Sequence, residues 1–163
     1  MIDRDTFTDL VSALCSPVTV VTTMTGEGPY GSTVSSLTSL SNDPPLMTFA
    51  LARTSGLLKY LRPGARVGAN ILGAGQRDIA SAFAHRNRGP CAKFAGVDWR
   101  PRGGLPYLPE SAGWTAGHVE RHVDGGDHVL LVVRVEEAES TTTAPLIYAR
   151  RVFGTHSAHA LAS

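Results

Sequence analysis

Residues 118–135 read HVERHVDGGDHVLLVVRV, and this stretch decides the fold class. The alternating run 118–123 and the apolar run 128–135 flank the turn sequence DGGD, which predicts two antiparallel strands joined by a tight hairpin. Further β-branched or apolar runs occur at 18–23, 46–51 and 67–72, and glycine or proline clusters separate them. Short strands joined by tight turns predict a mainly β fold, an antiparallel barrel.

Three short helices are expected around this barrel. The first should carry four apolar residues at i, i+3, i+4 and i+7, namely Phe7, Leu10, Val11 and Leu14. Residues 55–64 predict a two-turn helix that a Pro-Gly pair ends, and residues 76–84 predict a second surface helix. Residues 85–110 have the character of a long loop, and loops of that length are often binding loops.

Length and charge limit the classes of function. The 163 residues correspond to about one domain, and no apolar run is long enough to cross a bilayer, so no membrane role is expected. The start, MIDRD, lacks the basic and apolar regions of a secretory signal, which favours the cytoplasm. The formal net charge is +1 and the basic residues are spread along the chain, so nucleic acid is not an expected partner.

Common catalytic and metal motifs are absent from the sequence. There is no dinucleotide-binding G-x-G-x-x-G, no P-loop and no G-x-S-x-G elbow. His118 and His122 would lie on one face of a strand about 13 Å apart, too far to share a metal ion, so no metal is expected. Cys15 and Cys91 form no C-x-x-C pair and are expected to be reduced structural thiols.

Hydroxyl groups concentrate at residues 31–39, GSTVSSLTS. Taken alone, such a segment is more typical of a solvated sheet face than of a ligand site. Arg53-Thr54-Ser55 follows the next expected strand, where a guanidinium, hydroxyls and the N–H groups of a helix start could together bind a phosphate. Lys93, one of two lysines, adds a cation in the long loop.

Eight segments, in this order and spacing, resemble the flavin reductase-like family of FMN-binding split barrels, over about residues 7–154. They are VTVVTT at 18–23, GSTVSS at 31–36, S-x-D-P-P-L at 41–46, VGANIL at 67–72, Gln76 with Phe83-Ala84, KFAGVDW at 93–99, GDH at 126–128 and PLIY at 145–148. The resemblance implies one domain over 1–163 with a short C-terminal tail. It also implies a homodimer that reduces FMN or FAD with NADH or NADPH and supplies free reduced flavin to a separate monooxygenase.

The resemblance also implies roles for individual residues. Flavin binding falls on Ser32, Thr33, Val34, Ser35, Ser36, Ser39, Arg53, Thr54, Ser55, Phe83, Ala84 and Lys93. The nicotinamide side falls on His128, Tyr148 and Arg150, and His128 would position the hydride donor. Two alternatives stay open: His128 as a plain strand start, and Tyr148 as a barrel-packing residue.

Some positions depart from the family pattern. Ser16-Pro17 replaces a common Thr-Gly, Gly117 replaces a frequent cysteine, and Ala149 and Arg151 replace the His and Gly that often flank Arg150. The last changes adjoin the expected nicotinamide side, so flavin binding has more support than donor binding. The alternative function is a noncatalytic flavin- or haem-binding barrel that acts as a carrier or sensor.

Overall fold

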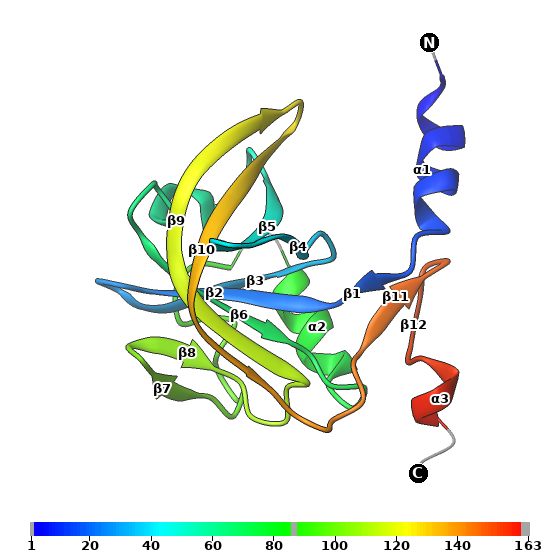
Figure 1. Cartoon of the computed structure of the whole chain (residues 1–163). Coiled ribbons are helices and arrows are strands. Elements are labelled where there is room, and N and C mark those ends of the chain that lie inside the picture. Colours follow the sequence, from blue (N-terminus) through cyan, green and yellow to red (C-terminus); the bar gives the residue numbers. More distant parts are fainter. Residues whose placement is uncertain (1, 86–87, 161–163) are drawn as a thin grey trace.

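The structure is a computed structural model that describes residues 2–85 and 88–160, and it confirms a mainly β, antiparallel fold with few short helices (Figure 1). In chain order the elements are α1 (Arg4–Ser12), β1 (Ser16–Pro17), β2 (Thr19–Thr25), β3 (Gly28–Val34), β4 (Thr38–Asn42), β5 (Pro45–Ala52), the 3₁₀ helix η1 (Leu58–Tyr60), β6 (Arg66–Ile71), α2 (Arg77–Ala84), β7 (Arg100–Arg102), β8 (Leu105–Tyr107), β9 (Gly113–Gly125), β10 (His128–Ser140), β11 (Ile147–Ala149), β12 (Val152–Gly154) and α3 (Ser157–Ala160). None of the described helices is long and apolar enough to span a membrane.

A seven-stranded antiparallel sheet forms the body of the molecule, in the order β3-β2-β6-β9-β10-β5-β4. Its longest ladder is the predicted hairpin β9–β10, which begins with His128 opposite Gly125 and continues to Ser140 opposite Gly113. Two register irregularities interrupt this ladder, between Val132 and Val133 and between Val135 and Glu137. Such bulges increase the local twist of a strand, and the long hairpin is strongly curved in Figure 1.

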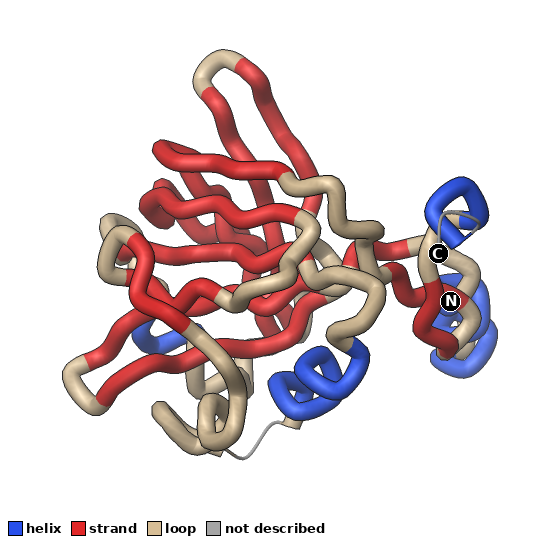
Figure 2. The backbone as a smooth tube through the Cα atoms, turned by 90° about the horizontal axis from the view of Figure 1, so that it is seen from below, coloured by secondary structure: helices blue, strands red, loops and turns tan. Residues whose placement is uncertain are grey.

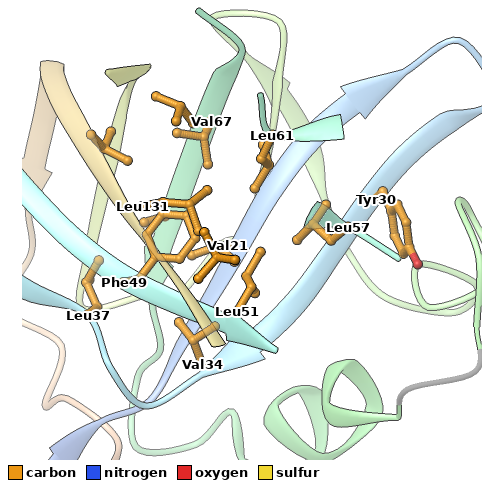
Figure 3. Close-up of a cluster of buried hydrophobic side chains, with 14 residues drawn as sticks. Val21, Tyr30, Val34, Leu37, Phe49, Leu51, Leu57, Leu61, Val67 and Leu131 are labelled. Carbon is orange, nitrogen blue, oxygen red and sulfur yellow. The ribbon is translucent and has the colours of Figure 1, made fainter. Parts of the chain in front are cut away.

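The curved sheet encloses a hydrophobic core (Figure 3). Strands from across the sheet contribute to one cluster, including Val21 from β2, Val34 from β3, Phe49 from β5 and Leu131 from β10. Each of these side chains is at most 7% exposed, and burial of an aliphatic or aromatic side chain is worth about 1.5–3 kcal/mol. This core holds β3 and β5, which form two walls of the pocket described below.

A second cluster fixes α2 and the long segment that follows it. Phe83, on the buried face of α2, is fully buried and meets Phe94 edge-to-face at 4.8 Å between ring centroids. Phe94 in turn meets Trp99 at 5.6 Å. The packing brings the C-terminal end of α2 and residue 93 onto β3.

Two of the expected elements differ from the structure. The predicted two-turn helix at 55–64 is only the single 3₁₀ turn Leu58–Tyr60, because the backbone leaves the helical region at Leu61, with a φ of −101° and a ψ of 49°, and Gly64 follows with a φ of 86°. The predicted loop at 85–110 contains the hairpin β7–β8, whose turn uses positive φ at Gly103 and Gly104. The Gly-Gly pair was a hairpin signal between unusually short strands.

The N-terminal helix forms as predicted but does not pack against the core. Asp3 caps α1 by accepting a hydrogen bond from the Thr6 N–H at 2.9 Å. No α1 residue is buried, and Phe7 and Leu10 are 54% and 65% exposed. Figure 2 shows α1 and α3 beside the small β1-β11-β12 sheet, apart from the main sheet.

Candidate functional site

A pocket of about 370 Å³ lies between β3, β5 and the ends of α2 and β10. Its lining residues are Tyr30, Gly31, Ser32, Thr33, Val34, Ser35, Ser36, Ala50, Leu51, Ala52, Thr54, Ser55, Gly56, Leu57, Ala84, Lys93 and His128. Most of these side chains are small, so main-chain N–H and C=O groups form much of the surface.

Residues 30–36 and residues 50–57 supply most of the pocket lining, and the two segments run in opposite directions. At one end, the Ala50 N–H donates to the Ser36 Oγ at 2.9 Å. At the other end, the Tyr30 hydroxyl lies against Gly56, where an added Cβ would approach the oxygen to 2.6 Å. The pocket therefore has a Ser36 end and a Tyr30 end, and these can be compared.

The Ser36 end is polar and includes an imidazole. His128 begins β10 opposite Ala52 on β5, and its ring lines the pocket. The Asp127 carboxylate lies 2.7 Å from His128 Nδ1, and this hydrogen bond is the main reason that the pKa of Asp127 is lowered. Because a carboxylate accepts, Nδ1 carries the proton, and Nε2 is left for a ligand.

The Tyr30 end contains a buried cation. Lys93 is only 5% exposed, and its ammonium donates to the Gly31 carbonyl at 3.1 Å and to the Phe83 carbonyl at 2.8 Å. Burial, together with the smaller effect of the Arg88 charge, lowers the pKa of Lys93 to about 8. No carboxylate among the described residues bonds this ammonium, so an anion entering the pocket would be its counterion.

Thr54 and Ser55 lie in the turn that follows β5, between Ala52 and η1. The Ser55 N–H donates to the Ala52 carbonyl at 2.8 Å, which fixes the turn. Both hydroxyl groups can face a ligand, because no hydrogen bond joins either of them to another described residue. The expected contribution of a helix N-terminus is not there, since η1 is a single turn of three residues.

The structure brings most of the predicted flavin-binding residues into this one pocket. They are Ser32, Thr33, Val34, Ser35, Ser36, Thr54, Ser55, Ala84 and Lys93, and the predicted donor-side residue His128 joins them. Thr33 has a structural task as well, because its hydroxyl donates to the Ala80 carbonyl of α2 at 2.7 Å. Whether each of them binds flavin stays a prediction.

Three predicted flavin-binding residues do not line the pocket. The Arg53 guanidinium is occupied by the β9–β10 turn, since it donates to Asp124 Oδ1 at 2.7 Å and to the Gly126 carbonyl at 2.8 Å. Ser39 is exposed on the edge strand β4. Phe83 is buried in the second core cluster, where its ring packs behind Gly31 and its carbonyl accepts from the Lys93 ammonium.

The two other predicted donor-side residues also lie outside the pocket. Tyr148 is on β11 and packs on Phe153 with ring centroids 5.0 Å apart, as the packing alternative expected. Arg150 occupies the turn between β11 and β12 with a φ of 51°, and its N–H donates to the Ser12 carbonyl at the end of α1. The β11–β12 turn is therefore tied to α1.

The remaining histidines and cysteines that the sequence singled out have other surroundings. His118 Nδ1 lies 2.9 Å from Glu136 Oε1, and His122 Nε2 lies 2.7 Å from the Leu61 carbonyl. Cys15 and Cys91 are free thiols and both are exposed, and the Cys91 thiol donates to the Glu27 carbonyl at 3.0 Å.

Sequence reasoning missed Tyr30 and Gly56 as pocket residues. Tyr30 directly precedes the hydroxyl-rich segment and Gly56 directly follows Ser55, so both adjoin predicted site residues. Proximity along the chain was the available signal. Their contact across the pocket depends on the tertiary pairing of two segments that no local pattern specifies.

The charge distribution of the pocket suits a particular kind of ligand. Small side chains and main-chain groups fit a flat ring with a polar rim, and the Lys93 ammonium fits a phosphate. A flavin nucleotide has these two parts, and the residues present fit it. The fold and the pocket define a mainly β protein with a site for a planar, phosphorylated cofactor.

The chain belongs to the flavin reductase like domain family, whose domain matches residues 11–157. It is 36% identical over 144 residues to a "Probable flavin reductase" of Rhizobium meliloti strain 1021, with 87% of this chain and 45% of that protein covered. It is 34% identical to the reductase component of 4-nitrophenol 4-monooxygenase/4-nitrocatechol 2-monooxygenase of Rhodococcus opacus, with 94% of this chain and 81% of that protein covered. The chain thus spans less than half the length of the first relative and about four fifths of the second.

A solved structure has the same fold. The NADH:FAD oxidoreductase of Streptomyces globisporus C-1027, in complex with NAD and FAD fragments, superposes with a TM-score of 0.87 at 26% sequence identity. The superposition covers 95% of this chain and 93% of that chain. The arrangement of the curled sheet and its peripheral elements is therefore shared along nearly the whole chain.

Proposed function

We propose that this protein is an NADH-dependent flavin reductase that reduces FMN or FAD. The single observation that carries the proposal is the pocket, which combines an imidazole end with a cationic end in a chain of this family. NADH as the donor is supported by the similar oxidoreductase that is named for NADH and FAD.

A bound flavin would supply the hydride acceptor, and the nicotinamide would supply the hydride. The protein's task is then mainly orientation, because holding two rings in contact removes most of the entropic cost of their encounter. Ser36 and the main chain of β5 would hold the ring edge, and Lys93 the phosphate. His128, oriented by Asp127, would hold the nicotinamide over the ring through Nε2.

Reduced flavin would leave the pocket and serve a separate monooxygenase. The similarity to the reductase component of a nitrophenol monooxygenase supports such a partner. Release requires that the flavin is held without a covalent bond, and the described pocket lining has no cysteine and one histidine, His128, which this proposal assigns to the nicotinamide. We expect the reaction to take place in the cytoplasm, where NADH is supplied.

The active form is a homodimer in this proposal, with α1 in the contact. The helix exposes an apolar face formed by Phe7, Leu10 and Val11, and a second copy of the chain would cover it. Sedimentation velocity should show a dimer, and Leu10→Asp should shift it toward the monomer. A monomeric wild-type protein would contradict this part of the proposal.

Anaerobic stopped-flow spectroscopy tests the activity. The protein is mixed with FMN or FAD and then with NADH or NADPH, and the absorbance of the oxidised flavin is followed. Rapid bleaching that depends on the protein and on NADH is the expected result. A flavin that binds but is not reduced by either donor would identify the noncatalytic carrier instead, and no binding of either flavin would reject both functions.

A further inference from the structure

Tyr30 is a pocket residue whose hydroxyl group has no hydrogen-bond partner among residues 2–85 and 88–160. The side chain is 6% exposed, and its ring belongs to the main core cluster at the edge marked by Leu57 in Figure 3. The oxygen points away from the other labelled side chains of that cluster (Figure 3). No described residue forms a hydrogen bond with it, and the oxygen is not enclosed by the protein, so it is accessible from the pocket.

The neighbouring Tyr60 shows what a satisfied tyrosine looks like in the same region. The two rings meet edge-to-face with centroids 5.7 Å apart, which fixes the Tyr30 ring. The Tyr60 hydroxyl donates to Glu27 Oε1 at 3.1 Å, and Tyr60 does not line the pocket. The Tyr30 hydroxyl is therefore held in place by its ring and is free to bond a molecule in the pocket.

The position of the hydroxyl determines what that molecule should present. Tyr30 precedes Gly31, whose carbonyl accepts from Lys93, so the hydroxyl and the buried ammonium belong to the same end of the pocket. Lys93 has three N–H groups and gives two to main-chain carbonyls, which leaves one. Burial raises the pKa of Tyr30, so the hydroxyl keeps its proton and is a donor at neutral pH.

We propose that the Tyr30 hydroxyl donates a hydrogen bond to the phosphate of the flavin and makes the protein select phosphorylated flavins over riboflavin. This inference rests on the proposed function, because it assigns a specificity-determining residue to the same pocket. A hydrogen bond to a charged group, when lost, reduces affinity by about tenfold or more.

The test compares Tyr30→Phe with the wild-type protein by fluorescence titration with FMN and with riboflavin, which has the same ring and no phosphate. We expect the FMN dissociation constant to rise about tenfold or more and the riboflavin constant to stay within twofold. Tyr60→Phe is the matched control, since it also removes one tyrosine hydroxyl, and it should leave both constants unchanged. Near-wild-type thermal unfolding would show that each variant is folded.

Other outcomes overturn the inference. Equal losses for FMN and riboflavin would mean that Tyr30 only supports the ring site, and no loss for either would place the phosphate elsewhere. Nicotinamide dinucleotides also carry phosphates, so the KM for NADH is measured with riboflavin as acceptor, and a rise in that KM without a change in FMN affinity would assign Tyr30 to the donor. If the wild-type protein binds neither flavin, the proposed function itself fails.

A second variant reaches the same hydroxyl without changing Tyr30. The Cβ added by Gly56→Ala would lie 2.6 Å from the Tyr30 oxygen, so the hydroxyl must move. The selectivity for FMN over riboflavin should fall in this variant as well, and retention of the wild-type selectivity in both variants would overturn the inference.

Discussion

The two ends of the pocket are built from the same pair of chain segments, yet they offer different chemistry. At the Ser36 end, the hydrogen-bonding groups are a hydroxyl, main-chain amides and the imidazole of His128, which Asp127 orients. At the Tyr30 end are the buried ammonium of Lys93 and a tyrosine hydroxyl that bonds no described residue. One end is therefore suited to orienting rings and the other to holding an anion. Substitutions at the first end should lower the rate of flavin reduction, and substitutions at the second should lower flavin affinity.

Lys93→Met should give the largest effect, at the Tyr30 end. Loss of a charge-assisted contact to the phosphate costs about 1.5–3 kcal/mol, or about ten- to 150-fold in FMN affinity. Riboflavin should be affected much less, and isothermal titration with both flavins measures the difference. The other lysine provides the control: Lys59 is exposed, with its ammonium 4.8 Å from the Tyr60 ring centroid, and Lys59→Met should bind FMN as the wild type does.

Lys93→Met also removes hydrogen bonds within the protein, and the riboflavin measurement controls for their loss. Lys93 also bonds the carbonyls of Gly31 and Phe83, which ties β3 to the end of α2. A loss shared equally by both flavins would show that this tie, and not the phosphate contact, is what the ammonium contributes.

His128→Ala tests the other end. Removal of one or two contacts to the nicotinamide should cost about 1–3 kcal/mol, a five- to 150-fold lower kcat/KM for NADH, while FMN affinity is unchanged. Titration and pre-steady-state reduction must both be measured, because a coupled assay does not separate the steps. His118→Ala is the control, since His118 bonds Glu136 outside the pocket. Reduction at the wild-type rate would make His128 only the first residue of β10.

The sequence predicts the fold better than it predicts the site. Local patterns specify the strands, because alternation and turn residues act between near neighbours, and the 118–135 hairpin formed as expected. The hydroxyl-rich segment was found for the same reason, as a cluster within one strand and its exit. The contact between Tyr30 and Gly56 was not, since their opposition arises only when the two walls pair in the folded protein.

Two predicted site residues that lie outside the pocket show the same limit. Tyr148 and Phe83 were assigned by the family pattern, but their aromatic rings are used for packing on Phe153 and Phe94. The sequence pattern around one residue does not show whether an aromatic ring will pack in the core or contact a ligand, or whether a cation will pair within the protein or bind a ligand. Partners that are distant in the sequence decide this.

The pH dependence of FMN affinity tests whether the protonated ammonium of Lys93 binds the phosphate. A phosphate binds the protonated ammonium, and the pKa of Lys93 is about 8 without ligand, so affinity should be full at pH 7 and decrease as the pH rises above 8. Between pH 7 and pH 9 the decrease should be about tenfold. The phosphate itself, with a second pKa of about 6, hardly changes its charge over this range. Riboflavin affinity should stay flat, and an equal pH dependence for both flavins would remove Lys93 as its origin.

We expect the smallest effect from Arg53→Ala. This variant tests whether a residue that holds the β9–β10 turn near His128 also contributes to phosphate binding. From the sequence, this arginine is a candidate phosphate ligand, which would make its loss as costly as that of Lys93. In the structure the guanidinium bonds Asp124 and the Gly126 carbonyl, and the Arg53 N–H donates to the Asp127 carbonyl at 2.9 Å. These contacts hold the β9–β10 turn that places His128, and the pair is exposed, so its own contribution to stability is small.

Because the main-chain contact survives the substitution, FMN affinity in Arg53→Ala should change less than twofold, and the rate of reduction by NADH should decrease only a few-fold. Fluorescence titration and stopped-flow reduction measure the two quantities. A tenfold loss of FMN affinity that is absent with riboflavin would show that the guanidinium leaves Asp124 to bind the phosphate. The cationic end of the pocket would then extend to the β9–β10 turn. Substitutions in that turn would affect both FMN affinity and the rate of reduction.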